Sequence, residues 1–490
     1  MVNITVKKSR LSGTITCPPS KSYSHRAIII SSLSNGISNL ENVLFSRDTV
    51  ATINCCKILG ISIESSPTVD KFQSHNKGDS SFNTVGNLKI SSNGGRFGFD
   101  TPDDILNAEN SGTTIRLLSS VCSLVNDGYT ILTGDKSLRK RPMGDLIKSL
   151  NQLGVDCFSS KISNTPPLII KGGGIRGGET QINGQISSQF ISSLLLSSVY
   201  AKTKVRIKIL GNQVSKPYIH STISIMKKFG IEVSNEINTI NNEDYPYYSL
   251  PSPAKKNIPS IIYPSINIVD KSKQNNLLTE FYDIPNNRDY LPTNFKIPGD
   301  FSTAALLISS AILSDGELTI ENLDFSLPQG DSNIVTISKE MGADIIEDKS
   351  KGAIKVRGKG QLDGGEFNLK DTPDLLPVVS ILSLKSKHTV KITGIAHARY
   401  KETDRVANIA TQLVKFGAEV KEEHDSINII PPKKIKNASI NSFEDHRLFM
   451  AFFIASLATE ESNIDGAESV DVSYPDFINE MKQLGARINE

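Results

Sequence analysis

The sequence has no excess of charge of one sign, few cysteines and no long hydrophobic run. Its 54 lysine and arginine residues nearly balance 52 aspartate and glutamate residues, for a net charge of +2. No overall field therefore favours nucleic acid or an anionic membrane as a partner. The five cysteines include no C-x-x-C pair, which argues against a disulfide framework and a zinc site and favours a reducing compartment.

The longest apolar run, Leu448 to Ala458, is far shorter than the roughly 20 residues that span a bilayer. The first residues, MVNITVKKSR, are not followed by an apolar stretch, so we expect neither a secretory signal nor an anchor. Hydrophobic residues make up 38% of the chain and charged residues 22%, which is ordinary for a globular protein. We predict a cytoplasmic protein without membrane contact.

A chain of 490 residues is expected to fold as two or three domains. One segment recurs six times: polar residues that cap a helix, a small and apolar helix, and then a strand-like run. The copies begin at Ser22, Ser111, Ser187, Asp300, Asp371 and Phe443.

A second, amphipathic helix follows in each copy and stops at a glycine, which is the residue expected just beyond a helix end. These glycines are Gly60, Gly154, Gly230, Gly342, Gly417 and Gly485. A unit of roughly 70 residues cannot bury both of its helices alone, so the units must pack together. They divide into two groups of three, with the break near 296–300.

Two stretches interrupt the repeat. Residues 235–295 are rich in Asn, Pro, Ser and Tyr, and residues 74–100 in Gly, Ser and Asn. Neither has a sustained period, so we predict insertions, the longer one partly mobile.

Basic residues recur beside the helix openings, as in PPSKSYSHRA, NAENSGTTIR, LRKRPMGD, VSKPYIH, YKETDR and EDHR. A helix N-terminus offers unpaired N–H groups and a partial positive charge, which bind anions. Each motif alone is also typical of a capped helix with solvated charges. Because the basic groups recur at one phase of the repeat, we predict a shared cleft for a ligand with several negative groups.

The same stretches, together with GQISSQFISSLLLSS, IPGDFSTAA, RYKETDRVANIATQLVKFGAEV and YPDFINEMKQLG, resemble the EPSP synthase family in content and order. The resemblance covers most of the chain outside the two insertions. It implies an inside-out α/β barrel of two domains, each built from three βαβαββ units. It further implies that residues 19–297 form one domain and residues 1–18 with 298–490 the other, with hinges near 18 and 298.

The resemblance also implies a reaction. The 5-hydroxyl of shikimate 3-phosphate attacks C2 of phosphoenolpyruvate while C3 is protonated, and phosphate leaves a tetrahedral intermediate. The partners are these two small molecules, without metal or cofactor, and the protein is expected to be a monomer. The chemistry requires a proton donor to carbon, a base, and cations for two phosphates and two carboxylates.

The family's functional residues are carried over here by position. The catalytic residues would be Lys21, Asp374 as the base, and Glu402. Shikimate 3-phosphate would contact Lys21, Ser22, Arg26, Ser187, Ser188, Gln189, Ser215, Tyr218, Asp374, His397 and Lys401. Phosphoenolpyruvate would contact Lys21, Asn110, Gly112, Arg141, Gln189, Arg405 and Arg447. On their own, the serines and Asp374 are equally typical of ordinary helix capping.

Three positions bear on how closely the chain follows the family. Val472 stands where many relatives have a lysine, so phosphoenolpyruvate binds less tightly or another base such as Lys482 substitutes. His397 replaces a frequent asparagine and permits titration near neutral pH. Gly112 leaves room for a phosphoenolpyruvate mimic and predicts sensitivity to glyphosate, which the loss of a cation at Val472 would weaken.

Two other functions remain open from the sequence. An enolpyruvyl transferase acting on UDP-N-acetylglucosamine would share the fold, but its reactive cysteine is absent from SLRKRPMG and its K-N pair is replaced by Lys21-Ser22. A binding protein without turnover would also use such a cleft. Exchange of Asp374 for asparagine discriminates, because only an enzyme has turnover to lose.

Overall fold

One strand order is shared by the six four-stranded sheets of the computed structural model, which describes residues 2–67, 84–96, 98–240 and 277–489. In each sheet the first and second strands of the unit pair in parallel. The fourth strand inserts antiparallel between the second and the third. In four of the units a helix follows each of the first two strands, which gives the order βαβαββ. In the other two units the first strands, Phe295–Lys296 and Ser12–Thr16, lie where the chain crosses, and each is followed along the chain by the first helix of the other unit. The predicted fold class is confirmed.

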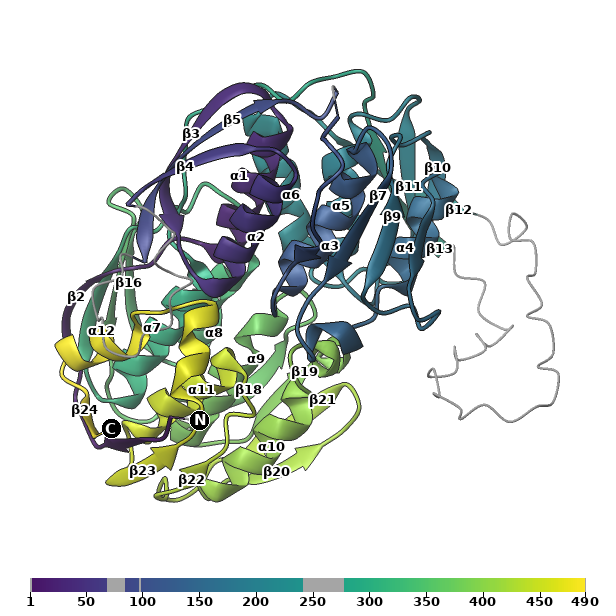
Figure 1. Cartoon of the computed structure of the whole chain (residues 1–490). Coiled ribbons are helices and arrows are strands. Elements are labelled where there is room, and N and C mark those ends of the chain that lie inside the picture. The colour runs from purple at the N-terminus through teal and green to yellow at the C-terminus, as the bar shows by residue number, and fades with distance from the viewer. Residues whose placement is uncertain (1, 68–83, 97, 241–276, 490) are drawn as a thin grey trace, which may run out of the picture.

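The first three units occupy the upper part of Figure 1. Unit one has β14 (Phe295–Lys296), α1 (Lys21–Leu33), β3 (Asn35–Leu44), α2 (Arg47–Ile58), β4 (Ser62–Ser66) and β5 (Val85–Asn93). Unit two has β6 (Leu106–Asn107), α3 (Gly112–Val121), β7 (Tyr129–Thr133), α4 (Gly144–Gln152), β8 (Cys157–Ser159) and β9 (Leu168–Lys171). Unit three has β10 (Gly178–Asn183), α5 (Ser188–Ser198), β11 (Val205–Leu210), α6 (Lys216–Lys228), β12 (Ser234–Ile240) and β13 (Leu277–Ile284).

The other three units form the lower part (Figure 1). Unit four has β2 (Ser12–Thr16), α7 (Phe301–Leu313), β15 (Glu317–Glu321), α8 (Asn333–Glu340), β16 (Asp344–Asp348) and β17 (Ala353–Arg357). Unit five has β18 (Gly365–Asn368), α9 (Leu376–Leu382), β19 (Val390–Thr393), α10 (Arg405–Lys415), β20 (Glu419–Glu422) and β21 (Ser426–Ile430). Unit six has β22 (Ser439–Ile440), α11 (His446–Ser456), β23 (Glu461–Ile464), α12 (Phe477–Gln483), β24 (Arg487–Asn489) and β1 (Ile4–Lys7).

The buried apolar side chains form two separate cores. One draws its members from residues 23–297, the other from residues 4–17 and 301–486. Between them the chain crosses twice, side by side: the Ser20 N–H donates to the Pro298 carbonyl (2.7 Å) and the Asp300 N–H to the Pro18 carbonyl (2.9 Å). We propose on this basis that residues 19–297 (the first half) and residues 1–18 with 298–490 (the second half) are two domains with hinges near 18 and 298.

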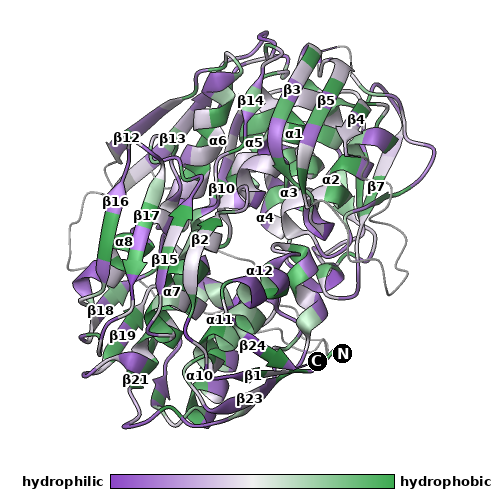
Figure 2. Cartoon of the chain, turned by 90° about the vertical axis from the view of Figure 1, so that its left-hand side faces the viewer, coloured by the Kyte–Doolittle hydropathy of each residue, from purple (hydrophilic) through white to green (hydrophobic). Residues whose placement is uncertain are grey.

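Helices lie inside each half and sheets outside. Helices α7, α9 and α11 pack on one another, as α3 does on α5, and Figure 2 shows apolar residues on α7 and α11. The inner helices are also rich in serine. Ser120 Oγ donates to the Ser193 carbonyl and lies 2.7 Å from Ser197 Oγ across the α3–α5 contact. Small hydroxyl residues let these two helices approach closely, and the Ser120 hydroxyl bonds across the contact.

The predicted helix ends agree with the structure, with shifts of one or two residues at three openings. All six glycines have positive φ, from 83° at Gly154 to 109° at Gly485, as expected of a left-handed residue after a helix. Ser111, Ser187 and Asp300 are N-caps. The other three caps are Ser20, Thr372 and Asp445, so our openings there were misplaced, and the fifth helix begins as a 3-10 turn, Pro373–Leu375.

The predicted insertions need correction. Strand β5 lies within 74–100, β12 and β13 lie largely or wholly within 235–295, and β14 begins at residue 295. All four are regular strands of their sheets. Their sequence pattern is weak, because the longer strands mix few apolar residues with Asn, Ser, Thr or Glu, as in SNEINTI, and β14 has only two residues. The remaining calls on 74–83 and 241–276 lie outside the described residues.

Candidate active site

A cleft between the two halves gathers the first turns of helices from both. Its empty volume is about 1090 Å³, including the part that is open to solvent. It is lined by Lys21, Ser22, His25, Arg26, Asp48, Gly112, Thr113, Arg116, Arg141, Pro142, Ile186, Ser187, Ser188, Gln189, Ser215, Tyr218, Asp300, Ser302, Asp374, His397, Tyr400, Lys401, Glu402, Arg405, His446 and Arg447. The repeat thus brings equivalent helix openings to one place.

With one exception, every site residue predicted from the sequence lines this cleft. The exception, Asn110, lies in an adjoining hollow that Arg141, Lys401 and Glu402 also line. Its side-chain oxygen accepts from Arg141 Nη2 (2.8 Å), and its amide donates to Asp135 Oδ2 (2.6 Å). In this structure Asn110 therefore holds Arg141 in place.

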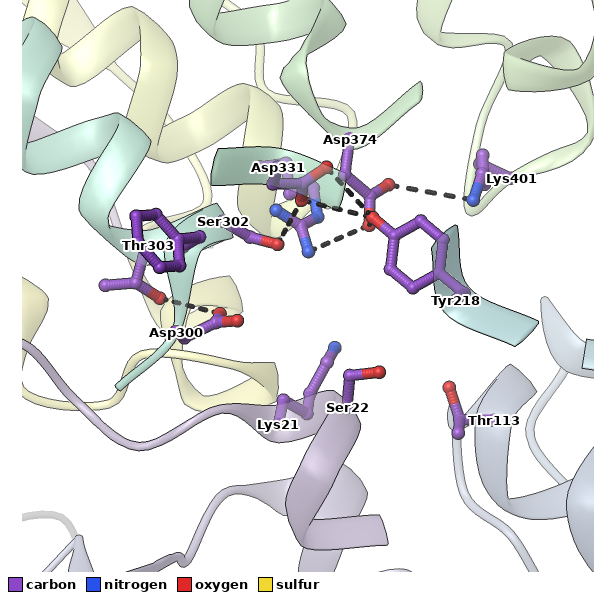
Figure 3. A network of polar contacts seen from close by, with 12 residues as sticks. Lys21, Ser22, Thr113, Tyr218, Asp300, Ser302, Thr303, Asp331, Asp374 and Lys401 are labelled. Carbon is purple, nitrogen blue, oxygen red and sulfur yellow. Dashed lines mark hydrogen bonds and ion pairs between the residues drawn. The ribbon is translucent and has the colours of Figure 1, made fainter. Parts of the chain in front are cut away.

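Asp374 lies among three cations of the second half. Arg405 Nη1 and Arg447 Nη2 are each 3.0 Å from its carboxylate, and Lys401 Nζ is 3.6 Å away (Figure 3). Burial opposes its ionisation, but Arg447, Lys401 and Arg405 outweigh burial and hold the pKa of Asp374 far below its usual value. Asp374 is therefore an ionised carboxylate at neutral pH.

Arg405 is the structural centre of this cluster. Its side chain is 1% exposed, and it also binds Glu402 (Nη2 to Oε2, 2.6 Å) and the fully buried Asp445 (Nε to Oδ2, 2.8 Å). These carboxylates overcome the cost of burial and raise the pKa of Arg405. The pKa of Glu402 is well below its usual value, because Arg405 and Arg141 outweigh its burial.

On the first half, Arg26 of α1 is held by α6 and by its own helix. Its Nε donates to Thr222 Oγ1 (2.7 Å), Nη2 to the Tyr218 carbonyl (3.2 Å) and Nη1 to Ser22 Oγ (2.6 Å). Burial lowers the pKa of Arg26 to about 10, so it stays charged. Nearby, Lys21 Nζ lies 3.1 Å from Asp48 Oδ2 on the first turn of α2.

A second cationic wall comes from α3 and the segment before α4. Arg116 Nη1 donates to Gln189 Oε1 (2.7 Å), and Gly112 lies so close to Arg141 that a Cβ there would be 2.7 Å from Nη1. Within the described residues, the Nε atoms of Arg116 and Arg141 are buried without a hydrogen-bond partner. Such donors suit an anionic ligand.

Several contacts join the two halves across the cleft. The Tyr218 hydroxyl is 3.1 Å from both oxygens of Asp331 and 3.5 Å from Asp374 Oδ2; Figure 3 shows it between the two carboxylates. Arg141 Nη1 is 3.8 Å from Glu402 Oε1, and the Ser215 N–H donates to the Lys370 carbonyl (3.1 Å). The structure is thus a closed arrangement.

Sequence reasoning missed several charged groups in or beside the cleft. Asp48 follows a strand outside any motif, and Asp331 follows the PQG turn in the fourth unit. His446 stands in EDHR, a motif in which only Arg447 was predicted to bind a ligand. Asp300 was read only as a helix opening. The repeat could have predicted three of them, because Asp48, Asp300 and His446 lie in or next to the first turn of a helix.

One expectation from unusual positions is wrong, and another finds no support. Burial lowers the pKa of His397 to about 4, with Lys401 contributing, so this imidazole does not titrate near neutral pH. Among the described residues that line the cleft there is neither Val472 nor Lys482, and the idea that Lys482 supplies the missing cation finds no support.

Known proteins match this chain in sequence and in fold. The family described as EPSP synthase (3-phosphoshikimate 1-carboxyvinyltransferase) matches residues 5–243 and 266–481. The chain belongs to the EPSP synthase family. A member from Methanocaldococcus jannaschii, named 3-phosphoshikimate 1-carboxyvinyltransferase, is 38% identical over 486 residues, covering 99% of this chain and 98% of that one. Another from Nitrosopumilus maritimus with the same name is 39% identical over 485 residues, with the same coverage.

A solved structure supports the fold independently. The EPSP synthase of Acinetobacter baumannii superposes with a TM-score of 0.74 over the full length of both chains, at 23% identity. At that identity the likeness concerns the fold alone. No helix among the described residues is both long and apolar enough to cross a membrane.

Proposed function

We propose that the protein transfers the enolpyruvyl group of phosphoenolpyruvate to the 5-hydroxyl of shikimate 3-phosphate, giving 5-enolpyruvylshikimate 3-phosphate and phosphate. Family membership and the names of relatives that match along the whole chain support this activity. The observation that carries it is the closed cleft, in which Asp374 and Glu402 lie among cations of both halves. The same names favour shikimate 3-phosphate over UDP-N-acetylglucosamine as acceptor.

The charge of the cleft suits two substrates that each carry a phosphate and a carboxylate. Seven cationic side chains line it: Lys21, Arg26, Arg116, Arg141, Lys401, Arg405 and Arg447. Its lining carboxylates, in contrast, are Asp48, Asp300, Asp374 and Glu402. Five of the cations, Lys21, Arg141, Lys401, Arg405 and Arg447, pair with Asp48, Asp374 or Glu402. Bound anions would therefore replace ion pairs that already exist. Arginine suits this exchange because its planar fork binds carboxylate and phosphate bidentately.

For shikimate 3-phosphate, the roles follow the places of the side chains. Ser187 and Ser188 begin α5 and Ser215 caps α6, where helix N-termini face the cleft. The Ser215 hydroxyl makes no capping hydrogen bond, which leaves it for the phosphate. Arg26 with Ser22 binds the carboxylate, Tyr218 contacts the ring, and Lys401, Gln189 and His397 complete the pocket.

Phosphoenolpyruvate lies between the halves. Lys21, Arg141 and Gln189 come from the first half, while Arg405 and Arg447 close on its carboxylate from the second. Gly112 lets the backbone approach the ligand beside Arg141. Asn110 acts through its hydrogen bond to Arg141. Because the clamp has parts on both halves, binding requires closure, which also excludes water.

The chemistry uses two carboxylates and one lysine. The 5-hydroxyl oxygen forms a bond to C2 as Asp374 takes the hydroxyl proton, and the electrons of the C2–C3 double bond accept a proton at C3 from Lys21. Glu402, which is ionised, is the second carboxylate in the proton transfers. The C2–O bond to phosphate then breaks as C3 loses a proton to the now neutral Lys21 or to Glu402, which restores the double bond. When substrate anions take over the cations around Asp374, its basicity rises.

Purified protein given shikimate 3-phosphate and phosphoenolpyruvate should release phosphate and form a product of the expected mass. Omission of either substrate, or exchange of shikimate 3-phosphate for UDP-N-acetylglucosamine, should abolish release. Release only with the nucleotide sugar would contradict the proposed acceptor, and none with either would favour a binding protein. A monomeric state and a cytoplasmic location stay predictions.

A further inference from the structure

One turn of the second half, residues 328–331, contacts the first half at the edge of the cleft. The Pro328 carbonyl accepts from Tyr23 Oη of α1 (3.0 Å) and from Ser221 Oγ of α6 (2.6 Å). Gly330 lies against Pro217, because a Cβ at Gly330 would be 2.8 Å from the Pro217 Cβ. The turn therefore contacts two helices of the first half directly.

Gln329 fixes this turn to its own half beside the hinge. Its Nε2 donates to the Gly299 carbonyl (2.8 Å), and its Oε1 accepts from the Phe301 N–H (3.1 Å). The turn is thus attached where the chain crosses between the halves. The position of the turn relative to the first half therefore depends on how the two halves are oriented.

The last residue of the turn, Asp331, holds the Tyr218 hydroxyl. Both carboxylate oxygens lie 3.1 Å from it, and Ser302 Oγ of α7 donates to Oδ2. Asp331 is 2% exposed and lies outside the set of residues that line the cleft. Burial raises the pKa of Tyr218 well above its usual value, so its hydroxyl remains a donor (Figure 3).

Tyr218 is held at its other end by the first half. Its backbone carbonyl accepts from Arg26 Nη2 (3.2 Å) and Thr222 Oγ1 (3.1 Å). The ring between these anchors lines the cleft. One side chain therefore joins a binding surface of the first half to a carboxylate of the second.

We propose that Asp331 is a positioning residue for shikimate 3-phosphate: it fixes the Tyr218 hydroxyl, so that the ring takes its place against the substrate only when the halves close. This inference rests on the proposed function for the identity of the ligand. Asp331 does not touch substrate, and it acts through Tyr218.

The test compares Asp331→Ala, Asp331→Asn, Tyr218→Phe and the double variant Asp331→Ala/Tyr218→Phe. Shikimate 3-phosphate binding is measured by calorimetry without phosphoenolpyruvate, and KM and kcat by phosphate release. Loss of one hydrogen bond to a charged group should weaken binding about tenfold in Asp331→Ala, with kcat changed less than about threefold. Asp331→Asn should restore most of the affinity, because the amide oxygen still accepts from Tyr218 and its NH₂ can donate to Ser302.

Tyr218→Phe should match Asp331→Ala, and the double variant should lose no more, since both changes remove one interaction. The matched control is Thr84→Ala, which removes another hydroxyl–carboxylate hydrogen bond between the halves, to Asp476, without contact to Tyr218. It should bind shikimate 3-phosphate within about twofold of wild type.

Normal affinity in Asp331→Ala, additive losses in the double variant, or an equal loss in Thr84→Ala would overturn the assignment. Thermal unfolding checks that each variant is folded. If Asp331→Ala does not fold, the affinities of Tyr218→Phe and Asp331→Asn for shikimate 3-phosphate still test the proposal. Calorimetry does not require turnover. Binding that responds as expected in a protein without turnover would refute the proposed function while supporting the role of Asp331.

Discussion

Replacement of Gly112 by alanine should weaken phosphoenolpyruvate binding through a neighbouring side chain. The added Cβ would lie 2.7 Å from Arg141 Nη1, whereas ordinary contact begins at 3.4 Å, so the guanidinium must move by about 0.7 Å. Arg141 is 7% exposed and its Nη2 is bound to Asn110 at 2.8 Å. It therefore has little freedom to move without losing a contact.

The loss of one hydrogen bond from a charged donor costs about 1.5–3 kcal/mol, so KM for phosphoenolpyruvate should rise about 10- to 150-fold. Affinity for shikimate 3-phosphate should stay within about twofold. Gly112 is the first residue of α3, so the change should lower the free energy of unfolding by no more than the cost of that one hydrogen bond, about 1.5–3 kcal/mol. Phosphate release at saturating shikimate 3-phosphate gives KM, and thermal unfolding gives stability.

The control is the same change in an Arg141→Ala background. If Gly112→Ala acts by displacing Arg141, it should add little to the loss caused by Arg141→Ala. A rise in KM of less than threefold, or full additivity of the two changes, would refute the reasoning.

The remaining predictions concern the buried charges and an inhibitor. Arg405→Ala should lower the free energy of unfolding by about 3–5 kcal/mol, because it leaves Asp445 buried and unpaired; an unchanged denaturation midpoint would contradict this. The pKa values of Asp374 and Glu402 are lowered in the folded state. Their contribution to stability is therefore present above about pH 4.5 and should be lost as pH falls further. Urea unfolding measured from pH 7 to 3 checks this. His397, with a pKa lowered to about 4, should make the protein less stable as pH falls from 6.5 to 4, and His397→Asn should remove that component while leaving the pH profile of turnover between 6 and 8 unchanged. Glyphosate should compete with phosphoenolpyruvate because Gly112 leaves space beside Arg141; inhibition that phosphoenolpyruvate does not relieve would count against this.

The repeat made much of the fold predictable. Each helix opening and each terminal glycine has a local cause in capping and in left-handed backbone, so Ser111, Ser187 and Gly230 could be placed from sequence alone. Strands β5 and β12 were missed because their alternation of polar and apolar residues is weak. They are stabilised by pairing with partners in their sheets, and local patterns do not report such pairing.

The site was predictable where it follows motifs and unpredictable where it depends on closure. Lys21, Arg405 and Arg447 stand in short motifs whose counterparts in the family are easily recognised. The partnership of Tyr218 with Asp331 joins residues 113 positions apart on different halves, and no periodicity records it. The pKa of His397 likewise depends on burial between elements, which composition does not reveal.

The central claim is that Asp374 does chemistry in a cleft that binds both substrates. Product of the mass of 5-enolpyruvylshikimate 3-phosphate should be quantified for wild type and Asp374→Asn in single-turnover mixtures, with calorimetric affinity for shikimate 3-phosphate measured on the same samples. The account predicts product from wild type and at least a hundredfold slower formation from Asp374→Asn, with shikimate 3-phosphate still bound. Equal rates for the two proteins, or no product from wild type, would contradict it.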